Sequence, residues 1–100
     1  MKVLIPDKEL NMLLKNGQSK KFYMHTKDKS FMQYLSSLYS LMQICDNIDE
    51  LIQFKCLEIN KEARNIFRAV VITSYGTKQI EFHCEENAFI LDNILSNERS

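Results

Sequence analysis

The sequence places one histidine, His83, where it could transfer a proton in a reaction. In the run Gln79–Cys84 polar and apolar residues alternate, so His83 shares a strand face with Glu81 and lies opposite Phe82. An imidazole titrates near neutral pH, which suits it to general acid–base catalysis. The alternative is a solvated strand histidine near Glu85, which would have no chemical role.

Basic and aromatic residues near this strand could bind a phosphate or a base. Lys78 lies at the predicted hairpin, Arg68 at the start of the preceding strand, and Lys55 on an earlier one. Each could contact a phosphate, and each could equally be a solvated strand end. Tyr75, in the hairpin turn, could stack on a base or simply complete the turn.

A second group of basic and aromatic residues lies in the polar segment 18–29, which contains Lys20, Lys21, Tyr23 and His25. Lysine with interleaved aromatic residues is a composition that can contact RNA. Lysine-rich loops before helices are also ordinary solubilising segments, so both interpretations stay open.

The first half of the chain should supply two helices. Val3–Ile5 is a short β-prone run that ends at Pro6. Asp7 is a candidate N-cap for a first helix that closes at Gly17. The apolar positions of Phe31–Cys45 follow the i, i+3, i+4, i+7 spacing of a longer amphipathic helix.

The second half should supply strands. Asp46–Glu50 is expected to form a turn, and Ser74–Thr77 is a turn with a glycine. The predicted strands are Leu51–Ile59, Ile66–Thr73, Gln79–Cys84 and Ala88–Ile94, followed by a polar tail from Ser96.

Together these elements predict an α+β fold, with two N-terminal helices packed on one face of a three- or four-stranded antiparallel meander. The short N-terminal strand is an optional member of that sheet. The other face would be left for solvent or a ligand, and any function is expected there.

Length and composition are typical of one globular domain spanning residues 1–100. Thirteen basic and thirteen acidic residues cancel, which argues against strong nonspecific nucleic-acid binding. The three cysteines, Cys45, Cys56 and Cys84, are widely spaced and fit reduced core thiols better than a metal site. No metal or other cofactor is implied. No membrane span and no secretory signal is evident, so we expect a cytoplasmic protein.

Several strings follow one another in a characteristic order. A leucine-bearing helix followed by glycine and a basic loop comes first, an acidic-Leu turn and a Phe-x-x-Leu strand follow the long helix, and two hairpin strands and a closing strand come last. These features are ELNMLLKNGQSKK, NIDEL, FKCL, FRAVVITSYGTKQIEF and FILDNILSN. In their joint order they resemble the RelE/HigB superfamily of type II toxin–antitoxin toxins over nearly the whole chain.

The resemblance implies a metal-independent endoribonuclease that cleaves mRNA on the ribosome and is held in check by a cognate antitoxin. In that family the reaction uses basic and aromatic side chains on the open sheet face. In this chain the catalytic candidates come from the residues described above and are His83, Lys78 and Arg68. The further RNA contacts would be Lys55, Tyr75, Lys20, Lys21, His25 and Arg99. The chain departs from the family pattern at three positions usually basic or aromatic, which here are Val71, Gln79 and Glu98.

These departures leave two hypotheses. The first is an active toxin of a toxin–antitoxin pair. The alternative is a catalytically impaired protein that keeps the toxin fold and acts as a protein- or RNA-binding module or as a homodimer.

Overall fold

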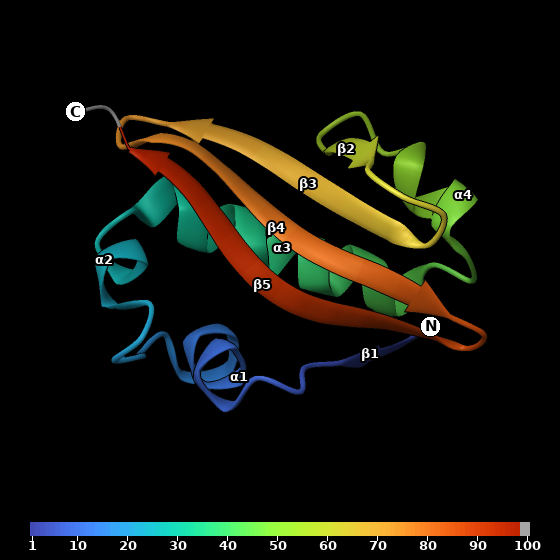
Figure 1. Cartoon of the computed structure of the whole chain (residues 1–100), viewed down its shortest axis with the longest axis horizontal. Coiled ribbons are helices and arrows are strands. Elements are labelled where there is room, and N and C mark those ends of the chain that lie inside the picture. The colour runs from blue at the N-terminus through green and yellow to red at the C-terminus, as the bar shows by residue number, and fades with distance from the viewer. Residues whose placement is uncertain (99–100) are drawn as a thin grey trace.

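The computed structural model describes residues 1–98 and has an α+β fold, as the sequence predicts (Figure 1). The described part contains four helices and five strands. In chain order they are β1 (Lys2–Leu4), α1 (Lys8–Asn16), α2 (Tyr23–Thr26), α3 (Lys29–Ile44), α4 (Ile48–Ile52), β2 (Glu58–Lys61), β3 (Ile66–Thr73), β4 (Gly76–Glu85) and β5 (Ala88–Glu98).

The five strands form one mixed sheet in the order β1-β5-β4-β3-β2. Neighbours from β2 to β5 are antiparallel, and β1 is parallel to β5. The sheet therefore has one strand more than the largest predicted meander, because the short N-terminal run does join it. Its partner is the last strand rather than the next one along the chain.

Local caps explain where the two longer helices begin and end. The Asp7 side chain accepts hydrogen bonds from the Glu9 and Leu10 backbone N–H groups at the start of α1. Gly17 ends that helix in the left-handed region, with φ at 69°. Asp28 caps α3 in the same way, accepting from the Phe31 N–H at 3.1 Å.

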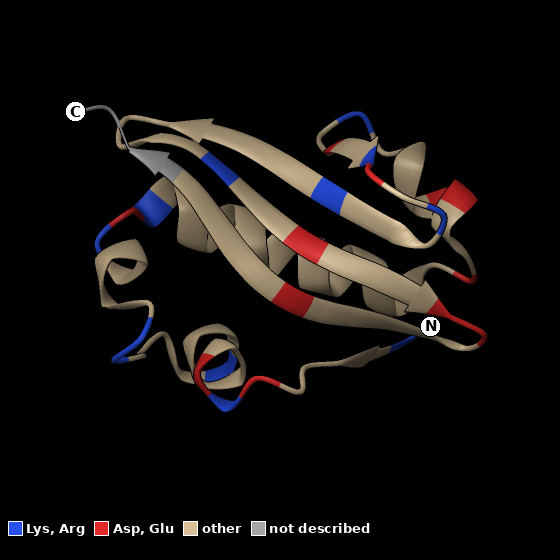
Figure 2. Cartoon of the chain, viewed as in Figure 1, with Lys and Arg blue, Asp and Glu red and all other residues tan. Residues whose placement is uncertain are grey.

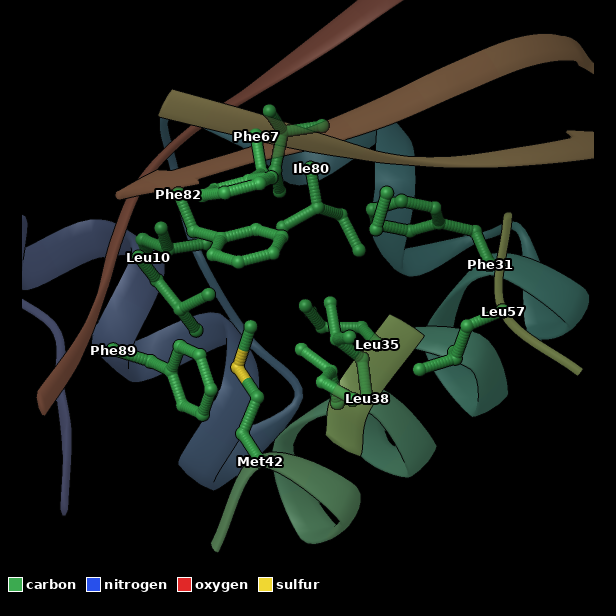
Figure 3. Close-up of a cluster of buried hydrophobic side chains, with 14 of the residues drawn as sticks. Leu10, Phe31, Leu35, Leu38, Met42, Leu57, Phe67, Ile80, Phe82 and Phe89 are labelled. Carbon is green, nitrogen blue, oxygen red and sulfur yellow. The ribbon is translucent and has the colours of Figure 1, made fainter. Parts of the chain in front are cut away.

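The core lies between α3 and one face of the sheet (Figure 3). The buried stripe of α3 faces large apolar side chains from the central strands, and Phe82 stacks on Phe67 with ring centroids 5.7 Å apart. The fully buried members include Phe31, Leu35, Leu38, Met42, Ile80, Phe82, Phe89 and Leu91. Figure 1 looks onto the opposite face, where no described helix crosses β3, β4 or β5.

One predicted strand is wrong. Most of Leu51–Ile59 is not a strand, because Ile48–Ile52 forms α4 and only Glu58–Lys61 pairs with β3. Asn47 caps α4 by accepting from the Glu50 N–H at 3.0 Å, which favours the helix. A helix of only five residues is too short for its apolar spacing to be recognised in the sequence.

Three predicted connections also contain regular structure. The segment 18–29 includes the short helix α2, and the predicted turn Asp46–Glu50 contains the first residues of α4. The predicted tail from Ser96 is the continuation of β5 to Glu98. None of the helices within residues 1–98 has both the length and the hydrophobicity required to cross a membrane.

Candidate functional site

Strand alternation gathers a set of charged side chains on the uncovered side of β3, β4 and β5, which we call the open face. Arg68 lies directly opposite Glu81 across β3 and β4, and His83 lies opposite Ile66. These side chains are only partly exposed, with 32% exposure for Arg68, 27% for Glu81 and 31% for His83. The open face therefore holds a histidine, a carboxylate and a guanidinium within one patch.

A β-bulge supplies the partner that orients the histidine. Glu81 pairs with Asn93 and Phe82 with Leu91, so Asp92 is one extra residue in β5. His83 Nδ1 lies 2.7 Å from Asp92 Oδ2. An N–H at Nδ1 therefore donates to the Asp92 carboxylate, which fixes the ring and turns Nε2 away from that strand.

The protonated form of His83 is favoured. Its Nε2 lies 3.4 Å from Glu85 Oε1, so both ring nitrogens have a carboxylate partner. The hydrogen bond with Asp92, helped by Glu85, outweighs burial and raises the pKa of His83 above the ordinary value of 6.5. The side chain is therefore suited to giving up a proton near neutral pH.

Arg68 is held by two carboxylates. Its Nε lies 3.1 Å from Glu81 Oε2, and its Nη1 lies 3.8 Å from Glu62 Oε1. A guanidinium has five N–H donors, so these two contacts leave donors that could bind a phosphate. Arg68 and His83 are diagonal neighbours across the two strands, which places their Cβ atoms about 7–8 Å apart.

Lys78, the third catalytic candidate, is on the other side of the sheet. Its ammonium is buried, 2.9 Å from Asp28 Oδ2 and 4.8 Å from the centre of the Phe31 ring. The Thr73 hydroxyl donates to the same Asp28 oxygen. Lys78 therefore joins the β3–β4 hairpin to the start of α3 and does not reach His83.

The carboxylate form of Asp28 is favoured in this pair. Burial by itself would raise the pKa of Asp28, but the hydrogen bonds from Thr73, Lys78 and the Phe31 N–H outweigh it and lower the pKa below 3.8. Extending the alternation of Gln79–Cys84 back by one residue puts Lys78 in phase with Ile80 and Phe82, and this is the signal that could have shown the lysine facing the core.

The remaining RNA-contact candidates are dispersed. Lys55 is exposed in the connection between α4 and β2. Tyr75 is 51% exposed in the β3–β4 turn, with the Lys78 ammonium 5.5 Å from its ring centre. Neither lies beside His83 in the strand register, and Arg99 lies outside the described residues.

The basic segment between α1 and α3 is ordered by contacts of its own. Lys21 forms an ion pair with Asp7 at 2.6 Å, and the Lys20 N–H donates to Glu9 at 2.8 Å. The His25 ring lies against Phe31, with centroids 5.0 Å apart. The structure therefore gives Lys21 and His25 packing roles and places the whole segment beside α1, away from the open face (Figure 1).

Two of the three positions that depart from the RelE/HigB pattern, Val71 and Gln79, lie on opposite faces of the sheet. Val71 is partly buried against the core, on the helix side of β3. Gln79 lies in phase with Glu81 and His83 on β4, so it belongs to the open face. The backbone of Glu98 pairs with Gly76 at the end of β5.

The cysteines are free, in three different environments. Cys45 is buried, Cys56 is exposed, and burial raises the pKa of the partly exposed Cys84 thiol to about 11. The expectation of a core thiol is therefore wrong for Cys56. Within residues 1–98 no three His, Cys, Asp or Glu side chains are grouped so that they could hold a metal ion.

Comparison of the chain with protein-family models, with curated proteins and with solved structures gives no match. The candidate site must therefore be judged from its geometry.

Sequence reasoning missed two members of this site. Glu81 was visible as a neighbour of His83 on the alternating strand, but only the strand register identifies Arg68 as its partner. Asp92 carried no signal, because regular alternation does not anticipate a bulge.

Acidic residues outnumber basic ones on and around the open face. Figure 2 shows acidic positions along β4 and β5 and basic positions on β3 and β4, and the basic residue of β4, Lys78, is buried on the core side. The acidic residues are Glu58, Glu62, Glu81, Glu85 and Asp92, against Arg68 and Lys2. This excess of negative charge opposes the binding of a polyanion such as RNA to the open face, even though Arg68 lies there.

Proposed function

We propose that the chain is the toxin of a type II toxin–antitoxin module, a ribosome-dependent mRNA endoribonuclease that acts in the cytoplasm. The observation that carries this proposal is the placing of Glu81, His83 and Arg68 together on the open face. A carboxylate, an imidazolium and a guanidinium are what cleavage by a 2′-hydroxyl requires when no metal takes part.

The proposed fold is of the RelE/HigB kind, with helices on one face of antiparallel strands. The packing of α3 against β3, β4 and β5 supports it. The parallel strand β1 and the helices α2 and α4 add to the simpler arrangement expected from the sequence.

Each of the three side chains has one role in the proposed reaction. Glu81 takes the proton of the 2′-hydroxyl, and the 2′-oxygen forms a bond to phosphorus while the bond from phosphorus to the 5′-oxygen breaks. His83 gives its proton to the departing 5′-oxygen. Arg68 binds the phosphate oxygens. The phosphate then takes the place of Glu81 as the partner of Arg68, and the Glu81 carboxylate is free to act as a base.

The direct test is to express the chain in a bacterium and to map the ends of its mRNA. The proposal predicts growth arrest and new 5′-hydroxyl ends within translated messages. His83→Ala, Glu81→Gln and Arg68→Ala should each lower the cleavage rate about 100-fold or more, whereas Lys61→Ala, a basic residue on β2, should not. Intact message with a folded, well-expressed chain would refute the nuclease.

The acidic excess favours a second candidate, a module of the same fold that has lost catalysis and binds a basic protein segment. Five carboxylates on and around the open face, against Arg68 and Lys2, are complementary to lysine and arginine side chains rather than to phosphates. If message stays intact, a labelled Lys/Arg-rich peptide should bind the open face and protect its amides from hydrogen exchange. An oligonucleotide should not.

A further inference from the structure

The side of α3 that faces away from the sheet carries no charged residue between Lys29 and Asp46. A helix that only faces water normally has charged residues there. We call this surface the outer face of α3. Its exposed members are Gln33, Ser36, Ser37, Ser40, Gln43 and Ile44.

A large apolar side chain is exposed at the C-terminal end of this face, where Ile44 is 70% exposed. Ile44 also lines a shallow hollow of about 430 Å³, together with Cys45, Glu50, Gln53 and Phe54. A large exposed apolar side chain on a helix face without charges can be buried by a contact with another macromolecule.

A second hollow lies nearer the middle of the same helix. It has a volume of about 380 Å³ and is lined by Ser36, Ser37, Ser40, Leu41 and Cys56. Short serine side chains leave the helix backbone accessible to a bulky neighbour. This hollow lies one to two helical turns before Ile44. Ile44 does not line it, so an isoleucine from another chain could occupy it.

We propose that a second copy of this chain packs on the outer face of α3, antiparallel and related by a two-fold axis through Ser40. In that arrangement a residue after Ser40 faces the residue equally far before it in the partner. Ile44 of each copy then enters the serine-lined hollow of the other copy. The small side chain of Ser40 allows the two helices to approach closely at the axis.

Charge complementarity at the ends of α3 selects this orientation. The first residue of α3 is the exposed Lys29, and the exposed Asp46 and Asp49 follow its last turn. An antiparallel pair brings the lysine of each copy toward the carboxylates of the other. A parallel pair would place like charges together, which disfavours it.

The proposed interface is independent of the proposed nuclease, because α3 lies behind the sheet and the open face in front of it (Figure 1). A dimer formed through α3 would leave both open faces accessible. Loss of one property therefore says nothing about the other.

Disulfide cross-linking tests the geometry directly. Cys56 lines the serine hollow, so the experiment uses Cys56→Ser as its background. Ser40→Cys in that background should give a covalent dimer on mild oxidation, because the two Cβ atoms meet at the axis. Ser30→Cys is the matched control, since its two copies would lie about 30 Å apart along the helices.

Sedimentation velocity on the unmodified chain tests the affinity, from micromolar to near-millimolar concentration. We expect a concentration-dependent dimer, and Ser40→Glu, which brings two carboxylates together at the axis, should weaken it at least about tenfold. Ser74→Glu, in the exposed β3–β4 turn, should not. A monomer at every concentration, or equal cross-linking of the two cysteine variants, would overturn the proposal.

Discussion

The ion pair between Lys78 and Asp28 is nearly inaccessible to water, with side-chain exposures of 5% and 2%. Two charges removed from water are stable only as long as each keeps its partner. Asp28 also caps α3 and accepts from Thr73, so the pair connects the hairpin turn, the helix start and the core.

Removing one partner of this ion pair should lower the free energy of unfolding strongly, whereas replacing both partners together should lower it much less. Lys78→Ala should lower the free energy of unfolding by about 3–5 kcal/mol, because it leaves the Asp28 carboxylate buried without its cation. Replacing both, as Lys78→Met with Asp28→Asn, should cost much less, since asparagine can still cap the helix. Urea unfolding of the single and double variants measures the difference. An equal cost for both would contradict the ion-pair explanation.

His83 should make stability depend on pH. Its pKa is raised on folding, so its stabilising contribution is complete below 6.5 and is lost as the pH rises through the folded-state pKa. Asp92→Asn removes the largest cause of the shift and should flatten this dependence. Urea unfolding at a series of pH values from below 6.5 upward measures this dependence. His83→Asn is the control, because a chain without the imidazole should not show the contribution of His83.

Among the elements, α1 ends at a residue whose backbone conformation is unusual. Gly17 has a φ of 69°, and a Cβ added there would meet no atom within 4 Å. The whole cost of Gly17→Ala should therefore be conformational, about 1–2 kcal/mol of unfolding free energy. Gly17→Asn, which tolerates this region better, should cost less, and thermal or urea unfolding of both variants would show the ranking. A loss much larger than 2 kcal/mol would point to a steric effect instead.

Elements with a long periodic pattern, or with clear start and stop residues such as Pro6, Asp7 and Gly17, could be predicted from the sequence, and α4 could not. The spacing from Phe31 identified α3, and alternation in β4 assigned His83 and Phe82 to opposite faces. The five residues of α4 gave no such signal. The same limit applies to the site, because alternation places His83 but says nothing of the bulge that brings Asp92 to it.

At the scale of the whole molecule, one aromatic side chain joins three neighbouring strands within the core. Phe82 is fully buried and contacts both Phe67 and Phe89. Phe82→Ala should cost about 3–5 kcal/mol, a large part of the stability of a domain this size. Ile72→Ala, at a position 76% exposed, should change stability by less than about 0.5 kcal/mol. Calorimetry of both variants compares them, and similar losses would mean that the described core is not what stabilises the fold.

The parallel pairing of β1 with β5 has a consequence for how the protein is made. Within residues 1–98, residues 2–4 pair only with residues 88–90, so β1 can join the sheet only after β5 has been synthesised. His83 likewise meets Asp92 only when β5 has been added. A nascent chain that stops short of β5 has neither a pairing partner for β1 nor an oriented His83 imidazole, so the complete sheet and the proposed chemistry both depend on the synthesis of this strand.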